Sequence, residues 1–587
     1  MGTLKFLDAP TRFVFFTGKG GVGKTSIACA TALRLAESGR RVLLVSTDPA
    51  SNIGQVFGVE IGNTITAMPG VTGLDALEID PDQAAAQYRE RIIGPVRNLL
   101  PQAEIASMTE QLSGSCTTEI ASFNEFTSLL ADPALVADYD HVIFDTAPTG
   151  HTIRLLKLPG DWTGFLDTGK GDASCLGPLS GLDKQRNLYA GAVAALSDPS
   201  ATRLVLVARA QAASLAEIAR TVDELAAAGI SASNVVVNAV LPDGDGGGDD
   251  DLVRAIRSRE RAALASIPAS LAGLPVDLID LKPDNMVGIE ALRSLFGDSG
   301  ASAPVGAEPV PLRPGASLDA LIDDLATSGH GLIMCMGKGG VGKTTIAAAL
   351  ATGLAQRGHA VHLTTTDPAA HVETTVADWH DLSNLTVSRV DPQAAVEDYR
   401  RQVMMSKGKN LDEAGRAVLA EDLRSPCTEE VAVFQQFSHL VNEARRTFVV
   451  MDTAPTGHTL LLMDATNSYH REIVRNMAPG VQYATPLMRL QDPDYTKVLL
   501  VTLPETTPVL EAAGLEEDLK RAGIHPWAWV VNQSVAAAET RSPLLRHRAV
   551  QERGPIDQAT SRAERVAVVP LLPDEPTGVE HLARLAS

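Results

Sequence analysis

The chain has 587 residues, of which 45% are hydrophobic and 21% are charged, so it is long enough for two or more domains of an ordinary globular protein. Its net charge of −21, from 71 acidic and 50 basic residues, disfavours a nucleic-acid-binding surface, which requires an excess of positive charge. Residues 1–10 lack the profile of a signal peptide, and no apolar run reaches the roughly 18 residues of a membrane helix, so we expect a cytoplasmic protein without direct membrane insertion.

The first half alternates apolar runs with helical patterns. A β-rich run at 12–16 leads into the glycine-rich segment GKGGVGKTS at 18–26, and residues 25–39 have a helical periodicity that ends at a glycine. Further strands are predicted at 41–47, 141–144, 203–208 and 235–237. Because strands that alternate with helices form parallel sheets covered on both faces, we expect a doubly wound α/β domain with a mostly parallel sheet.

The second half repeats these motifs in the same order. GKGGVGKTT returns at 337–345, which is 319 residues later, and DTAPTGHT at 145–152 recurs unchanged at 452–459. The number of residues between matched motifs changes along the chain only by amounts that differences in loop length explain. We therefore interpret the chain as an internal duplication of one α/β domain.

The boundary between the two halves is marked by composition. Residues 297–315 include four prolines and few bulky side chains, which is typical of an extended linker. A short amphipathic helix is predicted around 317–326. The predicted organisation is a first P-loop domain at 1–296, a linker at 297–316 and a second P-loop domain at 317–587.

Each glycine-rich segment has the pattern GxxxxGK[ST] between a strand and a helix, which is the context of a phosphate-binding loop. The glycines let backbone N–H groups surround phosphate oxygens, and the N-terminus of the next helix adds a favourable dipole. We expect Lys24 and Lys343 to reach the β- and γ-phosphates of ATP, and Thr25 and Thr344 to ligate Mg²⁺. The predicted ATP-binding positions are Gly18, Gly20, Gly21, Val22, Gly23, Lys24, Thr25 and Ser26 in the first half, and Gly337, Gly339, Gly340, Val341, Gly342, Lys343, Thr344 and Thr345 in the second.

Two carboxylates in each half follow predicted strands, at the sheet edge where ligands of α/β proteins bind. Asp48 and Asp367 follow the strand after the loop helix, and Asp145 and Asp452 end a later strand. One carboxylate of each pair can orient or deprotonate an attacking water, and the other can hold Mg²⁺ through water. We name Asp48 and Asp367 as candidate catalytic residues and all four as candidate Mg²⁺ ligands; the alternative is that they cap helices.

Asn238 and Asn532 follow late strands of the two halves. An amide at this place can pair with the edge of a purine, which would add both residues to the ATP site. Asparagine also favours turns for local backbone reasons, and that alternative stays open.

The additional lysine in each loop carries a resemblance. Lys19 and Lys338 mark the deviant Walker A class of P-loop ATPases, and together with STDPAS, DTAPTGHT and the duplication the whole chain resembles the ArsA family of arsenical pump-driving ATPases. The resemblance implies that Lys19 and Lys338 act as catalytic residues in trans, each on the nucleotide of the other half. It also implies a monomer whose halves form an intramolecular pseudodimer about a pseudo-twofold axis.

Three cysteines point to a metalloid. Cys116 and Cys427 occupy matching places in the two halves, whereas Cys175 has no counterpart, and three thiolates suit a soft centre such as As(III) or Sb(III). The resemblance extends the metalloid set to His151, His458 and Ser425, although the histidines could instead relay switch movements. For Cys29 and Cys335 we expect burial as small apolar side chains.

The resemblance implies an ATPase that is activated by arsenite or antimonite and drives their efflux through a membrane carrier, with an arsenic metallochaperone as a further candidate partner. The protein would then lie peripherally at the inner face of the membrane. The alternative is a targeting factor for tail-anchored membrane proteins, which shares this fold but commonly carries a CxxC motif and a methionine-rich groove. Met108, Met404 and Met405 lie in the comparable helical regions, but three methionines more often fill gaps in a core, and no CxxC is present. A partitioning ATPase would need a terminal amphipathic helix or a basic face, and we find neither.

Overall fold

A computed structural model of the chain describes residues 4–47, 53–97, 101–112, 115–132, 134–146, 182–243, 250–297, 317–366, 372–406, 408–423, 427–453 and 485–585. The chain divides into two units, Met1–Val305 with Ser542–Leu544, and Gly306–Arg541 with Leu545–Ser587. The dividing point falls within the predicted linker, most of which lies outside the described residues.

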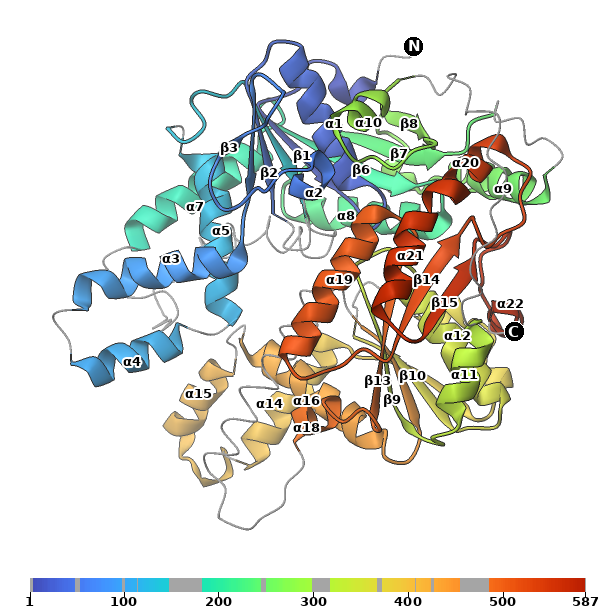
Figure 1. The fold of residues 1–587 in the computed structure, drawn as a ribbon. Helices are drawn as coiled ribbons and strands as arrows, with labels where there is room; N and C mark the ends of the chain where they lie inside the picture. The colour runs from blue at the N-terminus through green and yellow to red at the C-terminus, as the bar shows by residue number, and fades with distance from the viewer. Residues whose placement is uncertain are drawn as a thin grey trace. The chain divides into compact units, whose positions relative to one another are not determined.

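The first unit contains an eight-stranded sheet with the order β3-β4-β2-β5-β1-β6-β7-β8 (Figure 1). All strand pairs are parallel except the pair of β3 with β4, in which the short edge strand β3 is antiparallel. The strands are β1 (Phe13–Thr17), β2 (Val42–Ser46), β3 (Thr66–Ala67), β4 (Leu74–Glu78), β5 (His141–Asp145), β6 (Thr202–Arg209), β7 (Asn234–Val240) and β8 (Val276–Asp280).

The second unit contains a seven-stranded sheet with the order β11-β10-β12-β9-β13-β14-β15, and all of its described strand pairs are parallel. Its order repeats that of the first sheet without the antiparallel edge strand. The strands are β9 (Gly331–Met336), β10 (Val361–Thr365), β11 (Leu385–Arg389), β12 (Phe448–Asp452), β13 (Thr496–Thr502), β14 (Ala528–Ser534) and β15 (Val566–Pro570). The prediction of two doubly wound, mostly parallel α/β domains is confirmed.

Helices follow most strands in both units. In the first unit they are α1 (Lys24–Glu37), α2 (Ile53–Phe57), α3 (Pro81–Ile93), α4 (Gln102–Gln111), α5 (Ser115–Ala131), α7 (Leu182–Ser197), α8 (Ala212–Ala227), α9 (Asp251–Ala265) and α10 (Ile289–Ser294), with 3₁₀ turns at Lys5–Leu7, Gly94–Val96 and Ala269–Leu271. In the second unit they are α11 (Leu318–Ala326), α12 (Lys343–Gln356), α13 (Val372–Thr375), α14 (Pro392–Ser406), α15 (Glu413–Asp422), α16 (Cys427–Glu443), α18 (Pro486–Leu490), α19 (Thr506–Arg521), α20 (Pro543–Gln551), α21 (Arg553–Arg562) and α22 (Val579–Leu585), with 3₁₀ turns at Trp379–Asp381 and Gly408–Asn410. Among the described residues, none of these helices combines the length and the apolar character that crossing a bilayer requires.

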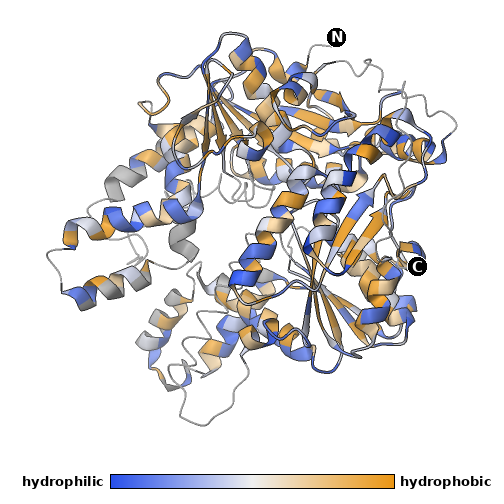
Figure 2. Ribbon diagram, in the orientation of Figure 1, coloured by the Kyte–Doolittle hydropathy of each residue, from blue (hydrophilic) through white to orange (hydrophobic). Residues whose placement is uncertain are grey.

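The central strands are buried along their whole length and are largely hydrophobic, because both faces of each sheet are covered (Figure 2). Along β1, Val14 and Phe16 belong to the core on the side of α1, whereas Phe13 and Phe15 belong to the core on the side of α5. This alternation follows from the two-residue period of a strand. The loop after β1 begins at the carboxyl end of this central strand, between the helices that cover the two faces of the sheet.

At one equivalent place in the core, a pair of neighbouring side chains differs between the two units. In the first unit Phe15 and Phe144 are direct neighbours on β1 and β5, with ring centroids 4.4 Å apart in a stacked pair. In the second unit the neighbours on β9 and β12 are Met334 and Met451. Both pairs are fully buried and share a cluster with a helical phenylalanine, which is Phe126 in the first unit.

This difference between the units generates a stability prediction. We expect Phe144→Ala to lower the free energy of unfolding of the first unit by about 3–5 kcal/mol, because it removes a stacked ring and leaves a cavity. Phe144→Met should cost only about 1–2 kcal/mol, since methionine can fill irregular space and stands at the equivalent place of the second unit. Urea unfolding measures both values, and equal losses for the two variants would contradict this account of the core.

Candidate active site

The loop between β1 and α1 is shaped by two close approaches to neighbouring strands. Gly18 lies against β6, where a Cβ would be 2.1 Å from the carbonyl oxygen of Val207. Gly23 has a φ of 89° and directly precedes the first residue of α1, and a Cβ there would be 2.2 Å from Nδ2 of Asn238. Only glycine combines this left-handed backbone with so little space. The glycines of the motif therefore bring the loop backbone close to the ends of β6 and β7.

The second loop has the same geometry. At Gly337 a Cβ would be 2.3 Å from the carbonyl oxygen of Val501, and at Gly342, with a φ of 90°, it would be 2.2 Å from Nδ2 of Asn532. Because α12 begins at Lys343, its N-terminal N–H groups lie at the end of this loop, as those of α1 do in the first unit. Both loops thus have the form that binds phosphate at a helix N-terminus.

The second lysine of each motif is buried inside its loop. Nζ of Lys24 donates a hydrogen bond to the carbonyl oxygen of Lys19 at 3.1 Å, and Nζ of Lys343 donates to that of Lys338 at 3.0 Å. Both side chains are only 6% exposed. An ammonium group has three protons to donate, so these lysines are suited to bind phosphate oxygens from within the loop.

A threonine and an aspartate, both predicted Mg²⁺ ligands, form a hydrogen bond at each loop. Oγ1 of Thr25 donates to Oδ2 of Asp145 at 2.7 Å, and Oγ1 of Thr344 donates to Oδ2 of Asp452 at 2.8 Å. Both aspartates end their strands and are fully buried. A hydroxyl and a carboxylate side by side offer the hard oxygen donors that Mg²⁺ prefers, so these residues fit the ion.

The two asparagines each donate a hydrogen bond to the backbone of the adjacent loop. Nδ2 of Asn238 donates to the carbonyl oxygen of Val22 at 2.8 Å, and Nδ2 of Asn532 donates to that of Val341 at 2.9 Å. The residues that follow them, Ala239 and Gln533, have positive φ values of 56° and 59°. The amide groups therefore fix the distance between each loop and the end of β7 or β14, and their predicted contact with the purine stays a prediction.

Sequence reasoning missed two acidic residues of this site. Lys19 forms an ion pair with Glu217 of α8, and Lys338 forms an ion pair with Glu511 of α19. Glu217 and Glu511 are 294 residues apart, the same spacing as Asn238 and Asn532. That shared spacing between the repeats is the signal that could have revealed them.

Several predicted residues lie outside the described part of the chain. These are Asp48, Asp367, His151, Cys175, Ser425 and His458. The backbone of Cys116 lies in the first turn of α5, and Cys427 begins the equivalent helix α16. The side chains of these two cysteines are not described, so the metalloid site stays a prediction.

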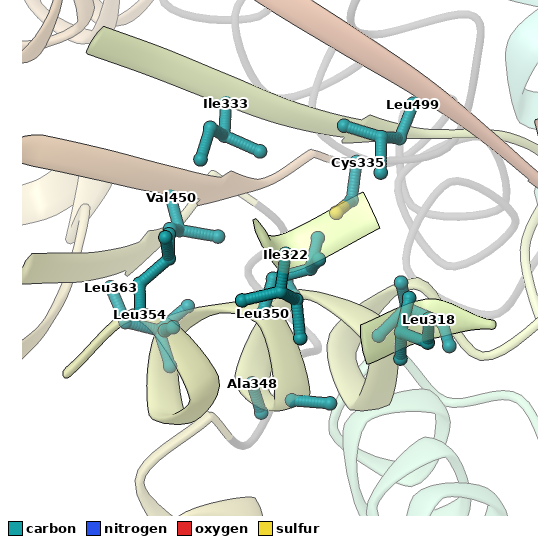
Figure 3. Close-up of a cluster of buried hydrophobic side chains, with 14 of the residues drawn as sticks. Leu318, Ile322, Ile333, Cys335, Ala348, Leu350, Leu354, Leu363, Val450 and Leu499 are labelled. Atoms are coloured by element: carbon teal, nitrogen blue, oxygen red, sulfur yellow. The ribbon is translucent and has the colours of Figure 1, made fainter. Parts of the chain in front are cut away.

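The other two cysteines are buried in the cores, as expected. Cys29 on α1 and Cys335 on β9 are both fully buried. Figure 3 shows Cys335 among apolar side chains such as Ile322 and Leu350. Burial raises the pKa of both thiols above the ordinary range, with a further increase from Asp145 for Cys29 and from Asp452 for Cys335. These thiols are therefore protonated and unreactive at neutral pH.

The two loops, with their buried lysines and Thr–Asp pairs at the carboxyl ends of parallel strands, define two P-loop nucleoside-triphosphatase domains. A family model described as anion-transporting ATPase matches residues 11–298, 330–489 and 475–587. The chain belongs to this family and hydrolyses ATP.

Its relatives match it over different shares of its length. It is 60% identical over 585 residues to an arsenical pump-driving ATPase of Escherichia coli, which covers 99% of this chain and 100% of that protein. It is 58% identical over 586 residues to an arsenical pump-driving ATPase of Acidiphilium multivorum, over 100% of both chains. The ATPase get3 of Schizosaccharomyces japonicus is 30% identical over 316 residues, which cover 50% of this chain and 94% of that protein.

The glycine geometry predicts a specific effect on nucleotide binding. Gly23→Ala should weaken ATP binding to the first unit by about tenfold or more, because the new Cβ displaces the Asn238 amide from the Val22 carbonyl. Gly39→Ala is the matched control, since Gly39 has a φ of 87° and open space around it. Both variants should lose about 1–2 kcal/mol of stability from the left-handed backbone. Titration with a fluorescent ATP analogue compares them, and equal affinities would contradict the role assigned to the close approach.

The buried thiols give a labelling prediction. In the folded protein at pH 8, iodoacetamide should leave Cys29 and Cys335 unmodified, because their thiols are both inaccessible and protonated. After unfolding in urea both should be alkylated. Mass spectrometry of the two peptides measures the extent of modification, and equal labelling rates before and after unfolding would refute the burial of these residues.

Proposed function

We propose that the chain is the ATP-hydrolysing component of an efflux system for arsenite and antimonite, in which metalloid binding stimulates hydrolysis. The observation that carries the proposal is the match with arsenical pump-driving ATPases over the full length of both chains. The get3 relative, by contrast, matches only half of this chain. The full-length match favours the efflux role over a role in targeting membrane proteins.

The residues of each loop have distinct parts in the proposed reaction. Lys24 and Lys343 bind the β- and γ-phosphates of ATP from inside the loops. The pairs Thr25–Asp145 and Thr344–Asp452 hold Mg²⁺, which supplies charge neutralisation at the phosphates when it is bound. The donor sets and the buried lysines support these assignments.

The remaining catalytic roles rest on motif position and resemblance. Asp48 and Asp367 orient or deprotonate the attacking water, and contribute to the Mg²⁺ site. Lys19 and Lys338 stabilise the negative charge that develops on the transferred phosphoryl group, as an arginine finger does in other P-loop enzymes. Asn238 and Asn532 add contacts to the base of ATP.

The metalloid site is proposed to consist of soft and nearby polar ligands. Cys116, Cys175 and Cys427 bind As(III) or Sb(III) through thiolates, and His151, His458 and Ser425 complete the set. In the sequence only five residues separate Asp145 from His151, and the same spacing joins Asp452 to His458. A change at Mg²⁺ on loss of the γ-phosphate can therefore reach the metalloid ligands through a short segment.

The partner of this ATPase is proposed to be a membrane carrier for arsenite, at which the protein lies peripherally on the cytoplasmic side. An arsenic metallochaperone that delivers the metalloid is a second proposed partner. The similarity to arsenical pump-driving ATPases, which are named for the pump that they drive, supports the carrier.

The proposal predicts metalloid-dependent kinetics. Antimonite or arsenite should raise the ATPase rate of the purified chain by about fivefold or more, since coupling between two sites is typically of this size. Cys116→Ser and Cys427→Ser should abolish this stimulation, whereas Lys24→Ala and Lys343→Ala should lower the rate with and without metalloid.

The control for the thiol variants is Cys29→Ala. Cys29 is buried, and alanine is present at the equivalent place, Ala348, of the second unit. This variant should keep full stimulation. A phosphate-release assay measures all rates, and a wild-type rate that is insensitive to both metalloids would refute the proposed function.

A further inference from the structure

The signature lysines, Lys19 and Lys338, each face an acidic residue of their own unit. Nζ of Lys19 lies 3.9 Å from Oε2 of Glu217, and Nζ of Lys338 is in direct contact with Oε1 of Glu511. The glutamate side chains are only 8% and 9% exposed. The same ion pair is thus present twice, at lysines for which the proposed mechanism requires a contact with phosphate.

The two glutamates occupy identical positions in the fold. Glu217 is the sixth residue of α8 and Glu511 is the sixth residue of α19. These helices follow β6 and β13, the strands against which Gly18 and Gly337 pack. The start of each loop is therefore held beside the strand that leads into the helix with the glutamate.

The surrounding sequence has diverged while the carboxylate is retained. Residues 216–220 read AEIAR, whereas residues 510–514 read LEAAG. A buried carboxylate is costly in a helix unless a cation or hydrogen bonds compensate for its lost hydration. Retention of glutamate at this place in both repeats indicates that its charge has a function related to the lysine.

A lysine in an ion pair is a weaker ligand for phosphate. The carboxylate neutralises the ammonium charge, so a phosphate group must compete with the glutamate for the same cation. Lysine is suited to such an exchange because its charge lies at the end of a flexible four-carbon chain. The side chain of Lys19 is 43% exposed, whereas that of Lys338 is 18% exposed, so water and salt screen the ion pair of the second unit less.

We propose that Glu217 and Glu511 are positioning residues that hold the signature lysines within their own unit, and that each lysine exchanges its glutamate for a phosphate oxygen before hydrolysis. The inference rests on the proposed role of Lys19 and Lys338 in hydrolysis. The glutamates set how readily the lysines become available. They limit the rate in the absence of metalloid.

The test uses the full chain with Glu217→Gln and Glu511→Gln. Glutamine keeps the shape and one acceptor of glutamate but removes the charge that competes with phosphate. Each variant should raise kcat without metalloid by about twofold to fivefold, the range expected for a partly exposed ion pair, with little change in KM for ATP. Glu511→Gln should have the larger effect. In each variant the fold stimulation by antimonite should decrease in proportion to the increase in kcat without metalloid.

Glu224→Gln is the matched control, because Glu224 lies on α8 but is exposed. It should leave kcat and the stimulation by antimonite unchanged. A second control combines Glu217→Gln with Lys19→Ala, and Glu511→Gln with Lys338→Ala. If the glutamates act through the lysines, the glutamine substitution has no further effect on kcat in these backgrounds, whereas a purely structural role would still change it.

The outcomes separate this inference from the proposed function. If Lys19→Ala and Lys338→Ala leave the ATPase rate unchanged, the proposed role of the lysines is wrong and the inference is wrong with it. If these variants lower the rate but Glu217→Gln and Glu511→Gln leave the rate without metalloid unchanged or lower it, the positioning role is overturned while the role of the lysines stands.

Discussion

The close approach of each glycine loop to the neighbouring strands is the constraint on which the rest of the site depends. Gly18 lies against β6 and Gly23 lies against the Asn238 amide of β7, so the loop is held on one side by a strand and on the other by a hydrogen bond to Val22. With the loop fixed there, Thr25 reaches Asp145. The second unit has the same contacts, and its distances differ from those of the first unit by at most 0.2 Å.

The fold was largely predictable because its signals are local. The predicted strand at 41–47 corresponds to β2 at Val42–Ser46, and the predicted helix at 25–39 corresponds to α1 at Lys24–Glu37. The Thr–Asp contact was also predictable, since both residues belong to recognised motifs at the same sheet edge. Glu217 was missed because its partner Lys19 is almost 200 residues earlier and a buried glutamate in a helix has no motif of its own; only the spacing between the repeats pointed to it. The bond from Asn238 to Val22 was missed for the same reason, since it joins residues 216 positions apart.

The duplication has preserved charge and backbone geometry more strictly than it has preserved apolar side chains. Lysines, aspartates, asparagines and the two glutamates recur at equivalent places in both units. The core residues around them were free to change as long as the volume remained filled. Polar contacts at the loops depend on direction and distance, whereas apolar contacts depend mainly on space, and this difference explains which positions were retained.

The first unit has Phe15 and Phe144 where the second has Met334 and Met451, and this difference affects how the strands within each unit can shift. An aromatic stack has few rotatable bonds and loses its contacts when the strands beneath it shift. Methionine has three rotatable side-chain bonds and can follow such a shift with small rotations. Asp145 and Asp452, which accept hydrogen bonds from the loop threonines, come directly after Phe144 and Met451, so the first carboxylate follows a rigid aromatic pair and the second follows flexible methionines. A single chain can in this way contain two chemically equivalent sites whose mechanical responses to the same ligand differ.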